Sequence, residues 1–262
     1  MAELAVCVSN DGKSSIYEII DAIKEAGFKK VFVQWYDKQW DGPDQQAQVD
    51  YCKKLGLEIV FAHLGYQSIN DIWLDTEIGS QFVERYKKDL DDVKKNGIPM
   101  VMMHACSKFE PPYPNELGLS RFEEVVDYAN EIGVEIGFEN TKVPGYQKYL
   151  LKNLKGKAGI CLDFGHCHAH LKDEFDFEFF KNRITSVHLH DNFGVKDEHL
   201  LPFDGNLDWQ WAMSELKKSG YSGPLTLEIV YHRDYVEKMS VKEFYKEGYA
   251  RGMKLAEMFD KA

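Results

Sequence analysis

The sequence predicts an α/β protein, a single (β/α)8 TIM barrel, and three observations lead there. Eight short apolar runs recur along the 262 residues, and a helical stretch follows each run. The repeat is about 33 residues long, which is the size of one strand-plus-helix unit. No glycine-rich phosphate-binding fingerprint follows the first run, which argues against a doubly wound dinucleotide-binding sheet.

Each predicted strand is a run rich in β-branched, aromatic and other apolar residues. Because the runs alternate with helical stretches, we expect the strands to pair in parallel, each crossover using a helix. In chain order the runs are residues 4–8, 30–35, 57–63, 98–104, 134–139, 158–163, 184–190 and 224–230.

The segments between the runs contain residues that are typical of the beginnings and ends of helices. Serine followed three residues later by glutamate has the spacing of a capping box, and proline suits a first helical turn. Glycine shortly before the next strand is typical of a helix end. The predicted starts are Ser15 with Glu18, Ser120 with Glu123, Ser240 with Glu243, and Pro43; the predicted stops are Gly27, Gly56, Gly97, Gly133, Gly156 and Gly220.

Side-chain alternation on the later strands favours a closed barrel over an open sheet. One face of each strand is small or polar and ends in a charged or imidazole group, while the other face is bulky and aliphatic. No linker or low-complexity stretch divides the chain, so we expect one domain over residues 1–262. The polar faces are Gly137 with Glu139, Ser186 with His188 and His190, and Thr226 with Glu228.

Composition narrows the class of protein. With 44% apolar residues and only eight prolines, the chain is suited to a large core rather than to disorder. A net charge of −11 discourages a broad electrostatic grip on nucleic acid. Five irregularly spaced cysteines without a signal peptide suggest a reduced, cytoplasmic compartment. No apolar run approaches 18 residues, so we expect no membrane partner.

Six consecutive predicted strands deliver histidine or carboxylate at the same end. In a barrel these carboxyl-terminal ends meet at one mouth, where catalytic residues gather. One such residue is usually structural, but six together indicate a divalent metal site, because buried carboxylates need a compensating cation. The residues are His63, His104, Glu139, Asp163 with His166, His188 with His190, and Glu228; Asp197 and His199 follow in the loop after strand seven.

Five segments resemble the xylose isomerase-like barrel superfamily, which includes sugar and sugar-phosphate isomerases and epimerases and the endonuclease IV group. They are GFENT, GICLDFGH, SVHLHDN, KDEHLLPFDGNLDW and LTLEIV. The resemblance follows strand order along nearly the whole chain and is densest from Gly137 to Val230. It implies one divalent metal ion held by Glu139, Asp163, His188 and Glu228. His188 is preferred to His190 because the family's ligand histidine lies three residues before an acidic residue, here Asp191.

The resemblance also implies a function. We expect a metal-dependent sugar or sugar-phosphate isomerase or epimerase that transfers a proton through a metal-stabilised enediolate, with Glu139 and Glu228 as acid and base. His166 and His190 would contact the substrate, and His63 and His104 would bind either the sugar or a further ion. The implied cofactor is Zn²⁺ or Mn²⁺, with Mg²⁺ or Co²⁺ as alternatives, at one to three ions per chain.

An endonuclease for abasic DNA is the main alternative, because the endonuclease IV group holds three zinc ions with a fuller ligand set. A metal-dependent lyase or dehydratase and a non-enzymatic sugar-binding barrel stay open as well. This sequence matches every position of the fuller set: His63, His104, Glu139, Asp163, His166, His188, Asp197, His199 and Glu228.

Two local features bear on that alternative. Glu198 stands where the nuclease branch commonly has arginine, while Phe203 and Asp204 interrupt the stretch that the isomerase branch commonly has before Gly205. Few basic residues fall in the predicted mouth loops, which counts mildly against DNA. The expected partner is therefore a small sugar or sugar phosphate, and a homo-oligomer stays open. The basic residues are Lys38, Lys108, Lys142, Lys196 and Arg233.

Overall fold

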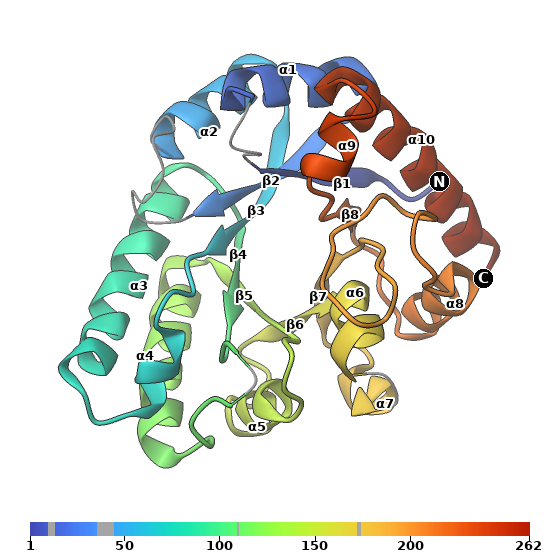
Figure 1. The fold of residues 1–262 in the computed structure, drawn as a ribbon. Helices are drawn as coiled ribbons and strands as arrows, with labels where there is room; N and C mark the ends of the chain where they lie inside the picture. The colour runs from blue at the N-terminus through green and yellow to red at the C-terminus, as the bar shows by residue number, and fades with distance from the viewer. Residues whose placement is uncertain (10–13, 36–44, 109, 172–173) are drawn as a thin grey trace.

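Eight parallel strands form a nearly closed barrel, and helices surround it (Figure 1). The computed structural model describes residues 1–9, 14–35, 45–108, 110–171 and 174–262. Neighbouring strands follow the order β7-β6-β5-β4-β3-β2-β1-β8, so each strand lies beside the next strand in the chain. The predicted (β/α)8 TIM barrel is confirmed.

Each predicted run coincides with one strand; β3 ends one residue later than predicted, at Leu64, and the last two strands end earlier than predicted. The runs 184–190 and 224–230 extend beyond β7 and β8 because their ends pair through a single bridge, Leu189 with Leu227, rather than through a ladder. The strands are β1 (Leu4–Val8), β2 (Lys30–Trp35), β3 (Glu58–Leu64), β4 (Met100–His104), β5 (Glu135–Glu139), β6 (Gly159–Asp163), β7 (Ile184–His188) and β8 (Leu225–Leu227).

Hydrogen bonds beyond these last two strands close the barrel. The backbone N–H of Leu189 donates to the carbonyl oxygen of Thr226 at 2.9 Å, and the N–H of Glu228 donates to the carbonyl oxygen of Leu189 at 3.0 Å. The closure therefore occurs at the carboxyl ends of β7 and β8, where His190 and Glu228 follow the strands. Main-chain hydrogen bonds therefore fix the backbone next to His190 and at Glu228, two of the candidate site residues.

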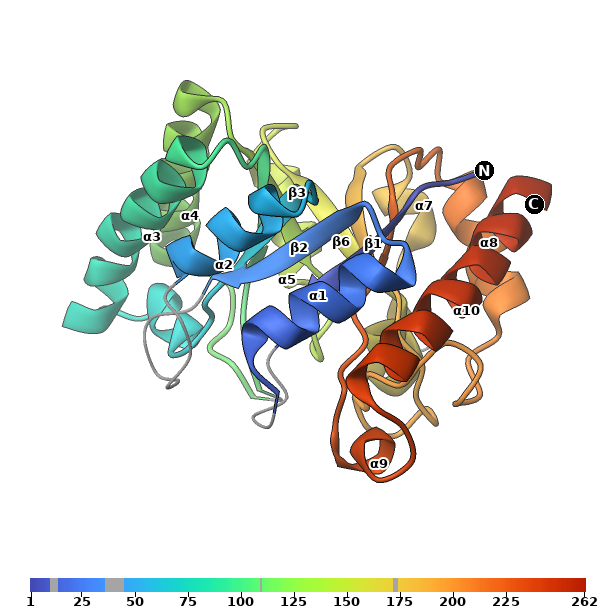
Figure 2. The same cartoon turned by 90° about the horizontal axis from the view of Figure 1, so that it is seen from above.

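The helices form a ring outside the strands, and the C-terminal helix α10 packs against both α1 and α8 (Figure 2). The ring thereby brings the two ends of the chain together. The α-helices are α1 (Ile16–Ala26), α2 (Gln45–Lys54), α3 (Glu77–Lys95), α4 (Glu116–Ile132), α5 (Tyr146–Asn153), α6 (Phe164–His166), α7 (Phe177–Phe180), α8 (Trp209–Lys218), α9 (Arg233–Val236) and α10 (Val241–Lys261), with a 3₁₀ turn η1 (Ile69–Trp73) and a π-helical turn η2 (Cys167–Leu171).

Two of the three predicted capping boxes are confirmed. Ser15 and Ser240 each cap a helix through the backbone N–H three residues on, and the glutamate at that position accepts in return. The prediction for Ser120 is wrong. Helix α4 begins a turn earlier, where the side chain of Asn115 accepts from the N–H of Gly118, so Ser120 lies inside the helix.

The six glycines predicted to stop helices all have positive φ, between 67° and 109°. Left-handed backbone of this kind is the usual way to end a helix, and glycine adopts it without the steric cost of a Cβ. These predictions are confirmed. Pro43, predicted for a first helical turn, lies outside the described residues.

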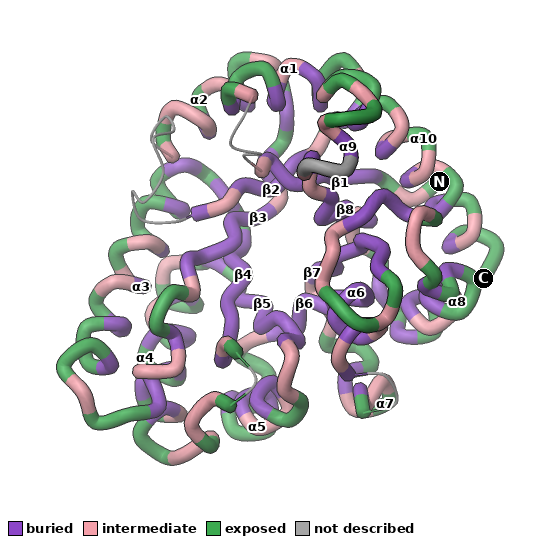
Figure 3. The backbone as a smooth tube through the Cα atoms, viewed as in Figure 1, coloured by how far each residue is buried: buried purple, intermediate pink, exposed green. Residues whose placement is uncertain are grey.

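Two apolar layers separate the strands from solvent. The larger layer lies between strands and helices, so the strands are buried and exposure increases toward the outer helix faces (Figure 3). A smaller cluster fills the barrel interior, where the rings of Phe32 and Phe61 stack with centroids 4.5 Å apart. The early strands thus supply a bulky apolar floor, whereas the later strands supply the polar face. The interior cluster is Cys7, Phe32, Phe61, Met100, Met102 and Cys161.

All five cysteines are buried, and none forms a disulfide. Their burial agrees with the role of small apolar groups. Among the described residues, no helix is both long enough and apolar enough to cross a membrane.

Because Ser240 caps a helix and Ser120 does not, we expect their replacement to change the stability of the chain differently. Ser240→Ala removes the side chain that caps α10, and we expect it to lower the free energy of unfolding by about 1 kcal/mol. Ser120→Ala is the matched control, because it removes only a hydroxyl that donates to the Leu117 carbonyl within α4, and should change it by less than about 0.5 kcal/mol. Urea unfolding followed by circular dichroism measures both, and equal effects would contradict the assignment of the two helix starts.

Candidate metal centre at the barrel mouth

A cavity of about 600 Å³ opens at the mouth formed by the carboxyl ends of the strands. That volume is within the range of small-molecule sites. The cavity is lined by five of the predicted site residues that come from strand ends or just after them, and by Asp197 and His199 from the loop after β7. Those five are His63, His104, Glu139, His166 and Glu228.

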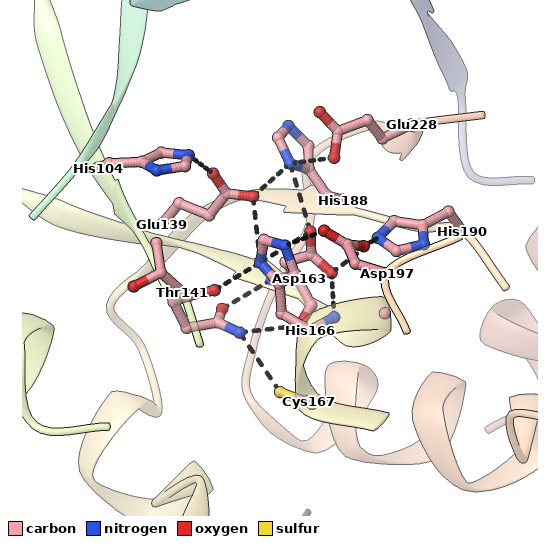
Figure 4. A network of polar contacts seen from close by, with 12 residues as sticks. His104, Glu139, Thr141, Asp163, His166, Cys167, His188, His190, Asp197 and Glu228 are labelled. Carbon is pink, nitrogen blue, oxygen red and sulfur yellow. Dashed lines mark hydrogen bonds and ion pairs between the residues drawn. The ribbon is translucent and has the colours of Figure 1, made fainter. Parts of the chain in front are cut away.

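Glu139, at the end of β5, lies at the centre of the site (Figure 4). Its carboxylate is 1% exposed, with Oε1 2.9 Å from His188 Nδ1 and Oε2 2.7 Å from His104 Nε2. His63 Nε2 lies 3.4 Å from the same Oε2. The Gln147 side chain donates to the Glu139 carbonyl oxygen and helps to fix the strand end. One carboxylate thus contacts imidazoles from three strands.

The four residues expected to hold one metal ion converge. His188 Nδ1 lies 2.9 Å from Glu139 Oε1, 3.0 Å from Glu228 Oε2 and 3.8 Å from Asp163 Oδ2. One ligand atom from each of the four lies within 4.8 Å of all the others, and all four residues are buried. Three buried carboxylates beside one imidazole repel one another unless positive charge is shared among them.

A second cluster of predicted ligands lies on the side of the loop after β7. Asp197 places Oδ2 3.0 Å from His166 Nε2 and Oδ1 3.3 Å from His199 Nε2. His190 is fully buried, with Nε2 3.3 Å from Asp163 Oδ1 and its ring stacked on His199 at 4.1 Å. His190 is not among the residues that line the cavity, so its predicted contact with substrate stays a prediction.

Two residues that the sequence reasoning did not assign position the ligands. Asn140 exchanges hydrogen bonds with the main chain of Asp163: its Nδ2 donates to the carbonyl oxygen at 2.9 Å, and its Oδ1 accepts the N–H at 2.8 Å. The Asp163 side chain then accepts from the N–H of His166 at 2.7 Å and starts the short helix α6. The position of Asn140 directly after Glu139, at the end of β5, is the sequence feature from which this role could have been predicted.

Asp191 is the other positioning residue, and the sequence indicates only its spacing of three residues from His188. Its fully buried carboxylate accepts four hydrogen bonds, which come from the N–H groups of Asn192, Phe203 and Leu207 and from the indole N–H of Trp209. These bonds tie together both ends of the loop that carries Asp197 and His199. The loop is therefore anchored from within rather than free to move away from the mouth.

Gly165 shows how closely this region is packed. A Cβ at this position would lie 1.9 Å from the His190 ring, so only glycine leaves the ring in place. Glycine is needed at this position for close packing against His190, and not for a left-handed backbone conformation.

The electrostatics of the cluster follow from its burial and its pairings. Burial by itself would raise the pKa of Glu139, but the imidazoles of His188 and His104 outweigh burial and hold that pKa well below its ordinary value. Burial disfavours a charged imidazole at His199, but Asp197 outweighs it and raises the pKa to about 10. Burial dominates at His104, whose pKa is lowered. Without a cation, imidazolium–carboxylate pairs therefore hold the cluster together.

The residues fit a divalent metal ion. Three carboxylates and an imidazole are ligand types that Zn²⁺ and Mn²⁺ accept. Within the described part of the chain, the buried Asp163 Oδ2 accepts no hydrogen bond, and the buried His188 Nε2 has no hydrogen-bond partner. Of these two atoms, Asp163 Oδ2 faces the other ligands of the set, and its buried lone pairs are what a cation would satisfy.

Sequence comparison gives one family and several distant relatives. The family model described as a xylose isomerase-like TIM barrel matches residues 20–255. An uncharacterized protein of Sinorhizobium fredii is 29% identical over 67% of this chain, and the match spans 60% of that relative's length. An uncharacterized protein of Methanocaldococcus jannaschii is 26% identical over 73% of this chain and 71% of the relative.

Solved structures share the fold. A fusion protein of a xylose isomerase-like TIM barrel with 4-hydroxyphenylpyruvate dioxygenase has a TM-score of 0.77 at 19% identity, covering 98% of this chain and 43% of that one. D-psicose 3-epimerase with D-tagatose from Clostridium cellulolyticum H10 has a TM-score of 0.75 at 14% identity, covering 99% of both chains. The IolI protein with a bound zinc atom has a TM-score of 0.74 at 16% identity, covering 99% and 98%.

The raised pKa of His199 predicts that metal binding releases protons. The pKa of His188, the imidazole of the four-residue set, is also raised, so this ring must lose its proton to bind the central ion. The pKa of His199 in the folded chain is about 10 against an ordinary value near 6.5, so at pH 7.5 this ring is protonated and loses its proton where a further ion binds it. We expect zinc binding to release about one proton or more per chain at pH 7.5, and less as the pH approaches 10. Calorimetric titration in buffers of different ionisation enthalpy measures this release.

Two histidine variants sharpen that measurement. His199→Gln should release about one proton fewer than the unmodified chain if three ions bind. His168→Gln is the control, because that ring pairs with Asn206 away from the cluster and should leave the release unchanged. Zinc binding without any proton release at pH 7.5 would contradict the charge assignment of the site.

Proposed function

Because the chain belongs to the family of xylose isomerase-like TIM barrels, we propose that it is a divalent-metal-dependent isomerase or epimerase of sugars or sugar phosphates. Neighbours in fold include proteins named as L-ribulose 3-epimerase and D-psicose 3-epimerase, which supports a reaction of this class. At identities below 20% those neighbours support the fold, so the substrate and the reaction rest on the site itself.

The observation that carries the proposal is the placement of two glutamates around one imidazole. Glu139 ends β5 and Glu228 follows β8, so they approach from different parts of the barrel wall, and their oxygens lie 2.9 and 3.0 Å from the same His188 Nδ1. Asp163 lies below them. An epimerase of this kind needs a carboxylate within reach of each side of one substrate carbon, whereas an isomerase needs one carboxylate beside the carbonyl. This pair could serve either reaction.

The difficult step is removal of a proton from a carbon next to a carbonyl. A divalent ion bound by Glu139, Asp163, His188 and Glu228 would supply Lewis-acid polarisation and stabilise developing negative charge. The imidazole neighbours outweigh burial and keep the pKa values of Glu139 and Glu228 below the ordinary range, so both carboxylates are ionised at neutral pH. An ionised carboxylate can accept the carbon-bound proton and then return it.

The route of the proton between the two glutamates decides whether the reaction is an epimerisation or an isomerisation. If one of them removes the proton and the other returns it on the opposite face, the product is an epimer. If one carboxylate carries the proton between neighbouring carbons, the product is the aldose or ketose isomer. The same geometry serves both reactions, because in each case the carboxylate acts at a carbon beside the carbonyl.

The histidines around the pair would bind and orient the sugar. His166 lines the cavity and is fixed by Asn140, whose carbonyl oxygen lies 2.8 Å from Nδ1. His63 and His104 line the opposite side, where the Tyr66 ring stacks on His104 with centroids 4.0 Å apart. We assign these three rings to substrate hydroxyls, and His190 to a supporting contact with Asp163.

A metal-dependent nuclease for abasic DNA is the second candidate, and one observation favours it. His63 and His104 form a candidate ligand group with Glu139, and Asp197 joins His166 to His199, so groups for more than one ion are present. Basic side chains are sparse at the mouth: Lys108 and Lys142 line the cavity, Lys38 lies outside the described residues, and the Arg233 side chain is not described. Cleavage of an abasic duplex by the zinc-loaded chain would establish this candidate.

Replacing the glutamates tests the proton-transfer role. Glu139→Gln and Glu228→Gln remove the bases, and we expect each to slow exchange of the substrate's carbon-bound proton with D₂O by about 10²- to 10⁴-fold. NMR of the ketose measures the exchange at saturating metal, with bound metal counted in each variant. Glu135→Gln, at the opposite end of the same strand β5, is the control. Full exchange by either of the first two variants would remove the proposed role.

A further inference from the structure

The cavity has two chemically different walls. The wall formed at the ends of β5 to β8 presents the carboxylates of Glu139, Glu228 and Asp197 together with imidazoles. The other wall comes from the loops after β3, β4 and β5, and among the described residues of these loops no acidic side chain beyond Glu139 lines the cavity. That second wall, here called the lysine wall, consists of Gln67, Ser68, Ser107, Lys108, Thr141 and Lys142.

Positive charge on the lysine wall is notable in a chain with a net charge of −11. Lys108 and Lys142 are the two lysines that line the cavity within the described part of the chain, whereas Lys196 is exposed on the loop after β7 and does not line it. Lys108 forms no ion pair with any described residue. A lysine that lines a cavity, as Lys108 and Lys142 both do, attracts an anionic group of a ligand.

The loops that carry these side chains are held by specific contacts. The N–H of Ser107 donates to Asn70 Oδ1 at 2.8 Å, and Asn70 Nδ2 donates to the Ser107 carbonyl oxygen at 2.9 Å. In the neighbouring loop, Thr141 Oγ1 lies 3.3 Å from Cys106 Sγ. The residue before Lys108 is thus fixed to η1, and the residue before Lys142 contacts the loop after β4.

Backbone strain coincides with this wall. Ser68 has a φ of 60° and Lys108 a φ of 66°, which is left-handed backbone that residues other than glycine rarely adopt. Such conformations cost free energy and gather at ligand-binding sites, where the surrounding structure holds them. Both strained residues line the same side of the cavity.

The opposed walls fix the orientation of a charged substrate. Lys108 and Lys142 are the lysines that line the cavity among the described residues, so a sugar that carries an anionic group would place it on the lysine wall and its carbonyl toward Glu139 and Glu228. We propose that the substrate is a sugar whose terminal carbon bears an anionic group, a phosphate ester or a carboxylate, bound by Lys108 and Lys142. The inference rests on the proposed function, since it concerns the substrate of that same site.

Three ketoses that differ only at C6 test this inference: D-fructose, D-fructose 6-phosphate and D-fructuronate. Calorimetry and proton exchange are measured with the metal-loaded full chain. We expect at least one of the two anions to bind about tenfold or more tightly than D-fructose. The anion that binds more tightly distinguishes a phosphate ester from a carboxylate.

Charge-removing variants assign the preference to the lysine wall. The double variant Lys108→Gln, Lys142→Gln should reduce the ratio of anion to neutral affinity about tenfold or more, while Lys196→Gln should keep the ratio of the unmodified chain. Thermal unfolding of all variants checks that the fold persists. Equal affinity for all three ketoses, or an unchanged ratio in the double variant, would overturn the inference.

The outcomes separate this inference from the proposed function. Lysine-dependent binding of an anion without any exchange of a carbon-bound proton would leave the anion subsite standing and remove the isomerase or epimerase. Exchange with D-fructose at an affinity equal to that of the anions would do the reverse. Absence of binding by all three ketoses, together with no heat from inorganic phosphate, would also count against the subsite.

Discussion

The burial of several carboxylates at one barrel mouth is the constraint on which the rest of the structure depends. Glu139, Asp163 and Glu228 are almost completely removed from water and converge on His188. An unpaired buried carboxylate is strongly unfavourable, so carboxylates that are ionised at neutral pH need positive charge beside them. Protonated imidazoles supply it here, and a divalent ion that displaces their protons would supply it in the loaded protein.

Rigid parts of the barrel surround this cluster and hold its side chains in place. Phe32 and Phe61 form an apolar floor on one side, and the Phe32 ring stacks on His188 with centroids 5.1 Å apart. Asn140 joins the ends of β5 and β6, and Asp191 anchors the loop after β7. The candidate ligands are thus held by main-chain and side-chain hydrogen bonds from their own strand ends, which is the support that a preorganised site needs.

Much of this arrangement could be predicted from the sequence, because residue type at a strand end is a local property. The periodic runs gave the barrel, and parallel pairing then placed His63, His104, Glu139 and Asp163 at one mouth. Local sequence patterns do not predict a structural feature that depends on which of several possible side-chain contacts forms in the folded chain. The spacing at Ser120 is that of a capping box, but the helix starts at Asn115 because that side chain caps it a turn earlier.

The same limit applies to the site. His188 and His190 have the same pleat parity, and only the packing of His190 beneath Asp163 and His199 separates their surroundings. Asp191 became recognisable as an anchor only when four donors from distant positions met its carboxylate. The lysine wall was equally hidden, because which basic residues line the cavity depends on how the loops fold over the mouth.

Diffraction from crystals grown with zinc, recorded on both sides of the zinc absorption edge, shows whether these carboxylates hold a metal ion. We expect an anomalous peak among the side chains of Glu139, Asp163, His188 and Glu228, with His188 Nδ1 turned from its carboxylate partners to the ion. Absence of a peak there at saturating zinc, with His188 still paired to Glu139 and Glu228, would contradict this expectation.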